Sequence, residues 1–330
     1  MGKVGGPLVL LRDTNTAGRQ QIHAKYASGE LVRVRRGVYL PTQKHRQLTR
    51  RQREKLHIVA TALTRPRCIL TGKSAALIHG LATPSYTSNG ITVEIGNATS
   101  TGRTESGCKY RNVPNDHESR AQTVQTEFGE VRASSLIDTC AEMALWHSTQ
   151  AAVTAIESAF QRRPLHVGEW EKMVELIIER VAGRKGAAQA RQALKLVTPF
   201  SESPRESELK VALWRAGFPV PYQQVNIYAR TGELLGRVDF MFECGLVVEY
   251  DGRVKYDNSL GTPLDHVLLN ERNREKALQN EGFVVLRVDA DSFWDQTYLA
   301  QIHNLLKHMQ NAGFSAPKAQ WRAAGRSWKE

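Results

Sequence analysis

The stretch "RVDFMFECGLVVEYDGRVKY" (Arg237–Tyr256) decides the fold of the carboxyl-terminal part of this 330-residue chain. The apolar runs "FMF" and "LVV" lie on either side of "ECG", and such runs, separated by turn residues, are typical of buried strands. The stretch therefore predicts a buried β-hairpin. It also places three carboxylates, Asp239, Glu249 and Asp251, among residues that belong in a core.

Hairpin geometry predicts that these carboxylates meet. Asp239 and Glu249 lie five residues on either side of Cys244, so we expect them to be cross-strand neighbours with Cβ atoms about 5 Å apart. Asp251 follows Glu249 by two residues and should point to the same face. Three converging carboxylates repel one another and resist burial. A divalent cation with oxygen ligands, Mg²⁺ or Mn²⁺, would resolve the conflict, which makes all three acids candidate metal ligands.

The alternative is a polar sheet edge with scattered acids. Such an edge would alternate with Lys, Thr and Gln, whereas the flanks here are apolar. A helix is predicted just upstream, after the linker-like "TPFSESPRES", with Ser203 as N-cap, Pro204 at the first helical position and Glu206 closing a capping box. Glu206 precedes Leu209 by three residues, so it should share the inward face of that helix.

The order of these elements resembles the PD-(D/E)XK nuclease fold: a helix with Glu, a strand with Asp, a strand with Glu, then a helix and a strand. More narrowly, "SPRESELKVALWRAGFPVPYQQV", "GRVDF", "LVVEYDGRVKY" and "NERNREKALQNEGFVVLRV" resemble, in order, a very-short-patch-repair-like endonuclease domain over about residues 201–291. The resemblance implies a central mixed sheet flanked by helices. It also implies that Asp239 and Glu249 ligate Mg²⁺, that Asp251 joins them, and that Glu206 completes or orients the site.

One position departs from the motif that names this fold. The motif has Lys two residues after the Glu, where this chain has Asp251. Lys255, just past Gly252, is the candidate to supply the missing cation, which would stabilise the charge that develops on the phosphate. Further candidate phosphate contacts are Arg253, Arg274 and Lys276. The alternative for these side chains is ordinary surface charge.

The amino-terminal part of the chain is strongly basic. Residues 1–55 hold 13 Lys and Arg against 3 Asp and Glu. A short helix is predicted over "TAGRQQIHAKYASG", followed by a hairpin over "LVRVRRGVYLP" with an arginine-rich face. A helix before a basic hairpin is typical of a winged helix, whose helix enters a major groove while its wing touches phosphate. Candidate DNA contacts are Lys25, Arg33, Arg35 and Arg36; a solvated arginine face is the alternative.

"GELVRVRRGVYLP" resembles the end of the winged-helix domain of AbiEi-type abortive-infection antitoxins, and "ILTGKSAALIHGLA" and "VRASSLIDTCAEMA" extend the resemblance. It implies a winged helix that binds the promoter of its own operon, with a cognate toxin protein as a further partner. The "GKS" of the second segment is no phosphate-binding loop, because Arg67 stands where such a loop needs Gly. Gly72 and Ser74 instead predict a helix start, and the middle region predicts a scaffold or partner-binding domain.

The whole chain has a formal net charge of +12 and a sequence pI of about 9.7. Such a charge is typical of proteins that bind a polyanion, most commonly nucleic acid, and a merely basic surface is the alternative. With the winged helix, we expect the chain to have double-stranded DNA as its partner. Its four cysteines are far apart and form neither a zinc ribbon nor a disulfide framework. The sequence has no apolar run long enough for a signal peptide or membrane span, and we expect a cytoplasmic protein.

The expected fold is α+β and multidomain. We expect a winged helix over residues 1–45, a mixed α/β AbiEi-like domain over 46–200, a PD-(D/E)XK endonuclease-like domain over 201–315 and a basic tail over 316–330. Two functions fit. One is a metal-dependent DNA endonuclease targeted by the winged helix, in phage defence or a toxin–antitoxin setting. The other is a DNA-binding autorepressor or antitoxin with a non-catalytic nuclease fold. The presence of Asp239 and Glu249 at the positions of the motif acids favours the first function. The absence of the motif lysine, where this chain has Asp251, favours the second.

Overall fold

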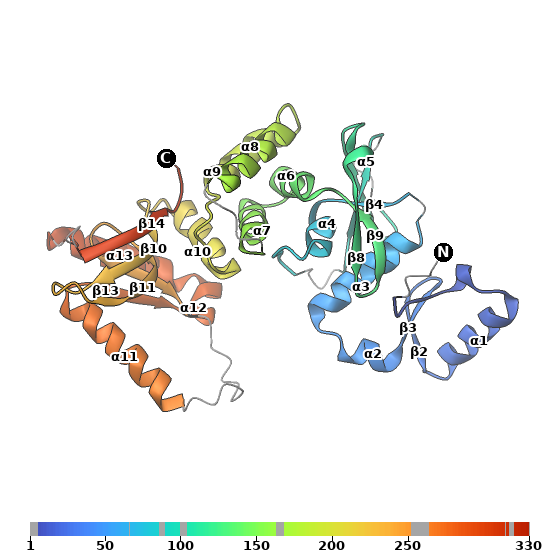
Figure 1. The fold of residues 1–330 in the computed structure, drawn as a ribbon, viewed down its shortest axis with the longest axis horizontal. Coiled ribbons are helices and arrows are strands. Elements are labelled where there is room, and N and C mark those ends of the chain that lie inside the picture. Colours follow the sequence, from blue (N-terminus) through green and yellow to red (C-terminus); the bar gives the residue numbers. More distant parts are fainter. Residues whose placement is uncertain are drawn as a thin grey trace. The chain divides into compact units, whose positions relative to one another are not determined.

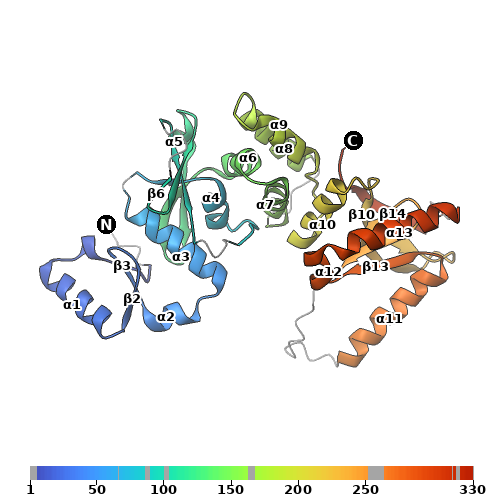
Figure 2. The same ribbon diagram turned by 180° about the vertical axis from the view of Figure 1, so that it is seen from behind.

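The chain is a mixed α/β protein. Its structure, a computed structural model, describes residues 6–65, 67–85, 90–99, 104–162, 168–251, 264–313, 315–316 and 320–329. Contacts divide the chain into two units (Figures 1 and 2), one of residues 1–155 and 171–191 and the other of residues 156–170 and 192–330. None of the helices in the described ranges is long and apolar enough to span a bilayer.

The first unit begins with a three-stranded sheet in the order β1-β3-β2, formed by Val9–Leu10, Val38–Pro41 and Leu31–Arg35. Helix α1 (Thr16–Ala27) starts at Asn15, whose side chain accepts a hydrogen bond from the Gly18 N–H. The predicted helix and hairpin are therefore both present. Helix α1 buries only Ile22, so most of its surface is open to solvent.

A six-stranded sheet follows in the order β6-β7-β5-β4-β9-β8. Its strands are β4 (Ile69–Leu70), β5 (Val93–Asn97), β6 (Thr104–Glu105), β7 (Cys108–Asn112), β8 (Gln122–Thr126) and β9 (Gly129–Ala133). The helices are α2 (Thr42–Gln47), α3 (Arg50–Leu63), α4 (Gly72–Ile78), α5 (His117–Arg120), α6 (Leu136–Trp146), α7 (Thr149–Arg162), α8 (Glu169–Val181) and α9 (Ala187–Lys195). The middle region is therefore mixed α/β, as expected, and the boundary between the two units falls within α7.

A buried acid, Glu94 on β5, organises this sheet. Its carboxylate accepts hydrogen bonds from the Lys73 N–H (2.7 Å), from Arg111 Nε (2.7 Å) and from the His147 ring (2.9 Å). Gly72 starts α4 at φ +53°, and a Cβ there would collide with the Glu94 carboxylate. The "GKS" segment thus starts a helix, as predicted, and its glycine is needed for this close approach.

The second unit is built on a five-stranded sheet in the order β13-β12-β11-β10-β14. Its strands are β10 (Tyr222–Tyr228), β11 (Leu234–Met241), β12 (Leu246–Tyr250), β13 (Val284–Val288) and β14 (Trp321–Arg326). The pair β12–β13 is parallel and the others are antiparallel, so the sheet is mixed, as predicted. Its helices are α10 (Pro204–Arg215), α11 (Leu264–Asn280), α12 (Ala290–Asp295) and α13 (Thr297–Asn311).

The carboxyl-terminal residues are not simply a tail. The segment expected as a basic extension forms β14, an edge strand that pairs antiparallel with β10. Trp321 and Ala323 pack against the core of the sheet, and Trp328 is buried. The apolar side chains at alternate positions explain the pairing, because they give the strand one face to bury.

A buried polar network fixes α10 within this unit. Lys210 is fully buried and binds Glu157 of α7 and the Thr198 hydroxyl (2.9 Å). Ser207 donates to the other Glu157 oxygen at 2.6 Å. Because every member is paired, the network holds α10 in one position. This matters for the site, since α10 carries Glu206.

Candidate active site

The predicted hairpin is present and brings Asp239 and Glu249 together. Strands β11 and β12 pair Phe240 with Val248, and Asp239 and Glu249 each lie one residue beyond this pair. The charge of Glu249 acts on Asp239, as expected of neighbours. The Asp239 Oδ2 atom accepts a hydrogen bond from the Tyr250 N–H at 2.9 Å. The two acids are therefore neighbours on adjacent strands, as the spacing predicted.

The row of residues continues across four strands. On β10, Gln224 lies between the pairs Gln223–Phe240 and Val225–Val238, which places it opposite Asp239. On β13, Arg287 pairs in register with Glu249. The row thus runs from an amide through two carboxylates to a guanidinium. Sheet pairing alone explains why residues so far apart in sequence meet here.

Glu206 reaches this row from α10. The Ser203 hydroxyl accepts a hydrogen bond from the Glu206 N–H (3.2 Å), so the predicted N-cap is confirmed. The predicted capping box is wrong in its other half: Glu206 Oε2 accepts from the N–H of Glu202 (2.8 Å), not from that of Ser203. The same oxygen accepts from Gln224 Nε2 at 2.9 Å. Glu206 is thereby turned inward, toward the row.

Asp239 lies among other carboxylates. Burial, followed by the charge of Glu206 and then of Glu249 and Glu202, raises the pKa of Asp239 to about 7, against the lowering effect of the Tyr250 N–H. Burial also raises the pKa of Glu206. Within the described ranges, no basic side chain forms an ion pair with Asp239. A carboxylate in such surroundings favours either a proton or a bound cation.

Glu249, in contrast, is neutralised by an arginine. Arg274 Nη2 lies 2.6 Å from Glu249 Oε1, and its Nη1 donates to the Arg237 carbonyl at 3.0 Å. Arg274 was predicted to contact phosphate, but in the structure it binds an acid of the site. Lys276, predicted alongside it, is exposed on α11.

Arg287 was missed by the sequence analysis. Its guanidinium lies 2.6 Å from Glu271 and 3.5 Å from Glu275 of α11, and about 4 Å from both Glu249 (3.9 Å) and Asp251 (4.0 Å). Burial acts to lower the pKa of Arg287, but the hydrogen bond and charge of Glu271 and the charges of Glu249 and Glu275 raise it overall. The available signal was an arginine inside the apolar strand "VVLRV".

The predicted ligand set fits a metal ion only in part. No group of three or more His, Cys, Asp and Glu side chains within the described ranges is arranged to hold a metal ion. Magnesium, however, is commonly bound by one or two carboxylates and several waters. Asp239, which is partly buried among other acids, and its neighbour Glu249 fit such a two-carboxylate site. Asp251, predicted as a third ligand, lies 4.0 Å from Arg287.

Two predicted site residues, Arg253 and Lys255, lie outside the described residues. The role of Lys255 as the displaced cation therefore stays a prediction.

The arginines of the predicted arginine-rich face of the amino-terminal hairpin have two different environments. Arg33 and Arg36 are exposed, as is Lys25 on α1, and the Arg33 guanidinium lies 5.6 Å from the ring centre of Tyr26. Arg35 instead donates to the Thr61 hydroxyl (2.8 Å) and to the Ser106 carbonyl (3.3 Å). The register between β2 and β3 shifts between Arg33 and Arg35, which explains their different directions.

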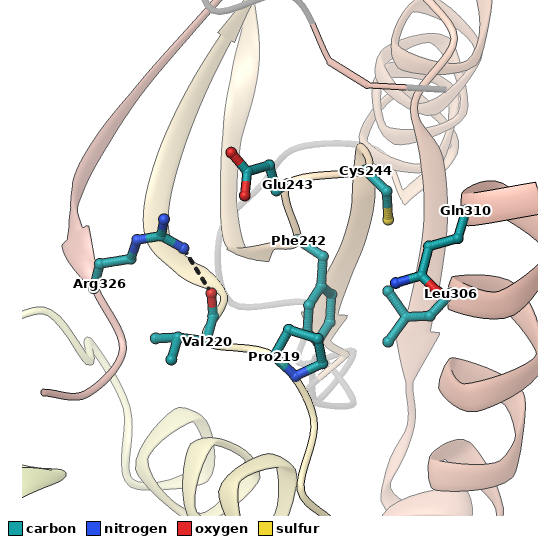
Figure 3. A pocket seen from close by; sticks show the side chains of 8 residues that line it. All are labelled: Pro219, Val220, Phe242, Glu243, Cys244, Leu306, Gln310 and Arg326. Carbon is teal, nitrogen blue, oxygen red and sulfur yellow. Dashed lines mark hydrogen bonds between the residues drawn. The ribbon is translucent and has the colours of Figure 1, made fainter. Parts of the chain in front are cut away.

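A pocket of about 280 Å³ lies at the turn of the β11–β12 hairpin (Figure 3). It is lined by Pro219, Val220, Phe242, Glu243, Cys244, Leu306, Gln310 and Arg326. Burial raises the pKa of the Cys244 thiol, which disfavours its nucleophilic form. The pocket lies at the opposite end of β12 from Asp251, so it is separate from the acids.

The comparisons with known proteins leave the function open. No protein-family model matches the chain. Two curated Mycobacterium tuberculosis proteins are 28% identical to it over 156 residues: MT2308 of strain CDC 1551 / Oshkosh and Rv2248 of strain H37Rv, both described as uncharacterized. The matched residues are 44% of this chain and 55% of each relative, so the chain spans about half the length of the curated relatives it matches.

Proposed function

We propose that this protein is a metal-dependent DNA endonuclease whose second unit has the PD-(D/E)XK nuclease fold of very-short-patch-repair-like enzymes. The observation that carries the proposal is that Asp239 and Glu249 lie close together on the neighbouring strands β11 and β12, where burial and neighbouring acids raise the pKa of Asp239 to about 7. A purely structural acid would be expected to have a cation or several donors. This one has a single backbone donor within the described ranges.

Asp239 and Glu249 would hold Mg²⁺ or Mn²⁺, which supplies positive charge to the scissile phosphate and lowers the pKa of bound water. Arg274 fixes the direction of Glu249 through its 2.6 Å contact. Glu206 is held beside Asp239 in turn by the hydrogen bonds that it accepts from Gln224 and the Glu202 N–H. Such support positions ligands for hydrolysis, in which water attacks phosphorus and a sugar oxygen leaves.

The amino-terminal unit would supply affinity for DNA. Lys25, Arg33 and Arg36 present three exposed cations on α1 and the β2–β3 hairpin, and phosphate contacts of this kind give affinity without sequence preference. Within the described residues, α1 is the one α-helix before the hairpin, whereas a helix-turn-helix uses two. The winged-helix assignment and the AbiEi-like nature of this unit are part of the proposal.

A second function is favoured by a specific observation. Glu249 and Asp251 lie near Arg274 and Arg287, and Asp251 occupies the position where the motif has lysine. A site neutralised by arginines needs no metal for its stability. The chain would then be a DNA-binding regulator or antitoxin with a non-catalytic nuclease fold, and a toxin protein would be its partner.

Incubation of the full chain with supercoiled plasmid, with Mg²⁺ or with EDTA, tests the proposal. We expect nicked or linear DNA with Mg²⁺ alone, and loss of cleavage by on the order of 10²–10³-fold in Asp239→Asn and in Glu249→Gln. Glu233→Gln is the matched control, because Glu233 is an exposed acid at the start of the same hairpin region. Plasmid that stays intact with Mg²⁺ and with Mn²⁺ would favour the regulator.

A further inference from the structure

Trp294, on α12, is unusually open to solvent. Its exposed fraction is 69%, the highest among the exposed large hydrophobic residues of the described chain, compared with 55% for Leu234. Tryptophan is highly buried on average in folded proteins, so an indole left this open suggests a binding role.

The indole is nevertheless held in place. The Arg205 guanidinium lies 4.9 Å from the Trp294 ring centre and 5.6 Å from that of Phe293. Glu208 holds Arg205 from one helical turn away, at 2.5 Å. Phe293 meets Trp294 edge-on, with ring centres 5.8 Å apart and planes at 79°. A tryptophan fixed by a cation and a second ring pays little conformational entropy when it stacks on a ligand.

This aromatic surface is continuous with the candidate active site. Phe293 is buried and meets the Tyr250 ring edge-on at 5.5 Å, while the Tyr250 N–H donates to Asp239. Helix α12 follows β13, which runs parallel to β12, so α12 and Asp251 lie at the same end of the sheet. Both views show α12 beside α10, the helix that carries Arg205 and Glu206 (Figures 1 and 2).

We propose that Trp294 and Arg205 form a stacking site for an unpaired nucleobase of the DNA strand whose phosphate lies at Asp239 and Glu249. This inference rests on the proposed function. Every base has a π-face that can stack on an indole, and a guanidinium beside the ring can contact the adjoining phosphate. Bases of an intact duplex are covered by their neighbours in the stack. The site therefore favours single-stranded or locally opened DNA.

Binding measurements on the full chain carrying Asp239→Asn, which prevents cleavage, test this site. The probes are a fluorescein-labelled single-stranded oligonucleotide of mixed sequence and the corresponding duplex, both at one fixed salt concentration. Trp294→Ala should weaken single-strand binding about 5- to 150-fold and change duplex binding by less than about twofold. Trp294→Phe should retain most of the affinity, since it keeps an aromatic face. Leu234→Ala, at the next most exposed apolar position of the same unit, should bind as the parent does.

Two results would overturn the inference. One is unchanged single-strand binding in Trp294→Ala, which would leave the indole free for another partner, such as a protein. The other is an equal loss on both probes, which would indicate a general DNA contact. Because the assay needs no cleavage, a selective loss supports the stacking site even if plasmid stays intact. If the wild-type chain cleaves plasmid but Trp294→Ala leaves single-strand binding unchanged, the proposed nuclease function stands and the stacking site is wrong.

Discussion

Each of the two units buries a carboxylate, and the surroundings of the two acids differ. Glu94 in the first unit meets Arg111, His147 and the Lys73 N–H; burial acts to raise its pKa, but His147 and Arg111 lower it to about 2. Asp239 in the second unit meets other acids, and its pKa rises to about 7. The first acid is fully satisfied by its own domain, as structural acids are. The second has no basic ion-pair partner among the described residues, and a bound cation would supply the positive charge.

The largest expected effect is on stability and concerns Glu94, the acid whose role is structural. Glu94→Gln should destabilise the first unit by about 3–5 kcal/mol, because it leaves the half-buried Arg111 without its anionic partner. Chemical denaturation followed by circular dichroism measures the change. Asp239→Asn at pH 8 should do the reverse and stabilise its unit. Equal destabilisation by both substitutions would remove the distinction between the two acids.

Substitution of Arg274 tests whether this arginine orients Glu249 for metal binding or competes with the metal for it. Arg274→Ala should lower cleavage about 10- to 100-fold, as loss of a group that orients a ligand does, with DNA binding little changed. Arg274→Lys serves as the charge-preserving control and should recover part of the rate. Faster cleavage in Arg274→Ala, with tighter metal binding, would show instead that the arginine competes with the metal.

The pH dependence of stability distinguishes the two acids by sign. Folding raises the pKa of Asp239 from its ordinary value to about 7, so the folded state keeps a proton that the unfolded state releases. Stability should therefore fall as pH rises from about 4 to 7, by up to about 4 kcal/mol, and then level off. Glu94, with its lowered pKa, contributes stability above about pH 4 that is lost toward pH 2. Asp239→Asn should flatten the fall between pH 4 and 7, whereas an unchanged profile would contradict the raised pKa.

The smallest effect concerns the amino-terminal arginines. Replacing Arg33 and Arg36 together by Ala should flatten the plot of log K against log salt by up to about 0.9 for each DNA phosphate that the variant no longer neutralises. Arg35→Ala should leave that slope unchanged and lower stability instead, since Arg35 binds Thr61 and Ser106. A slope that changes only in Arg35→Ala would reverse this assignment.

Local patterns predicted part of this structure correctly. The turn at "ECG" fixed the pairing of Asp239 with Glu249, because hairpin register follows from the residue count around the turn. The Ser203 cap followed from adjacent residues in the same way. The partners of Glu249 could not be predicted, because Arg274 lies on a helix 25 residues downstream and Arg287 arrives through a parallel pairing 38 residues downstream. Nor could the Glu94 network, whose members Arg111 and His147 lie 17 and 53 residues away.

Other features depended on irregularities that a periodic pattern does not contain. Arg35 was grouped with Arg33 by simple alternation, but the register shift between them sends Arg35 toward α3. The last strand, β14, was hidden by the basic composition of its segment, although its half-buried Trp321 and Ala323 alternate with exposed neighbours. In both places tertiary contacts decided the conformation over local composition.

Titration of the full chain with Mg²⁺ or Mn²⁺ by calorimetry, in two buffers of different ionisation enthalpy, tests the central claim most directly. If Asp239 binds the metal, its proton must leave: about one proton should be released per ion at pH 6 and close to none at pH 8.5. The same titration of Asp239→Asn should show neither the proton release nor the binding. Equal metal binding by wild type and Asp239→Asn, or binding with no proton release at pH 6, would contradict the assignment of this acid as the metal site.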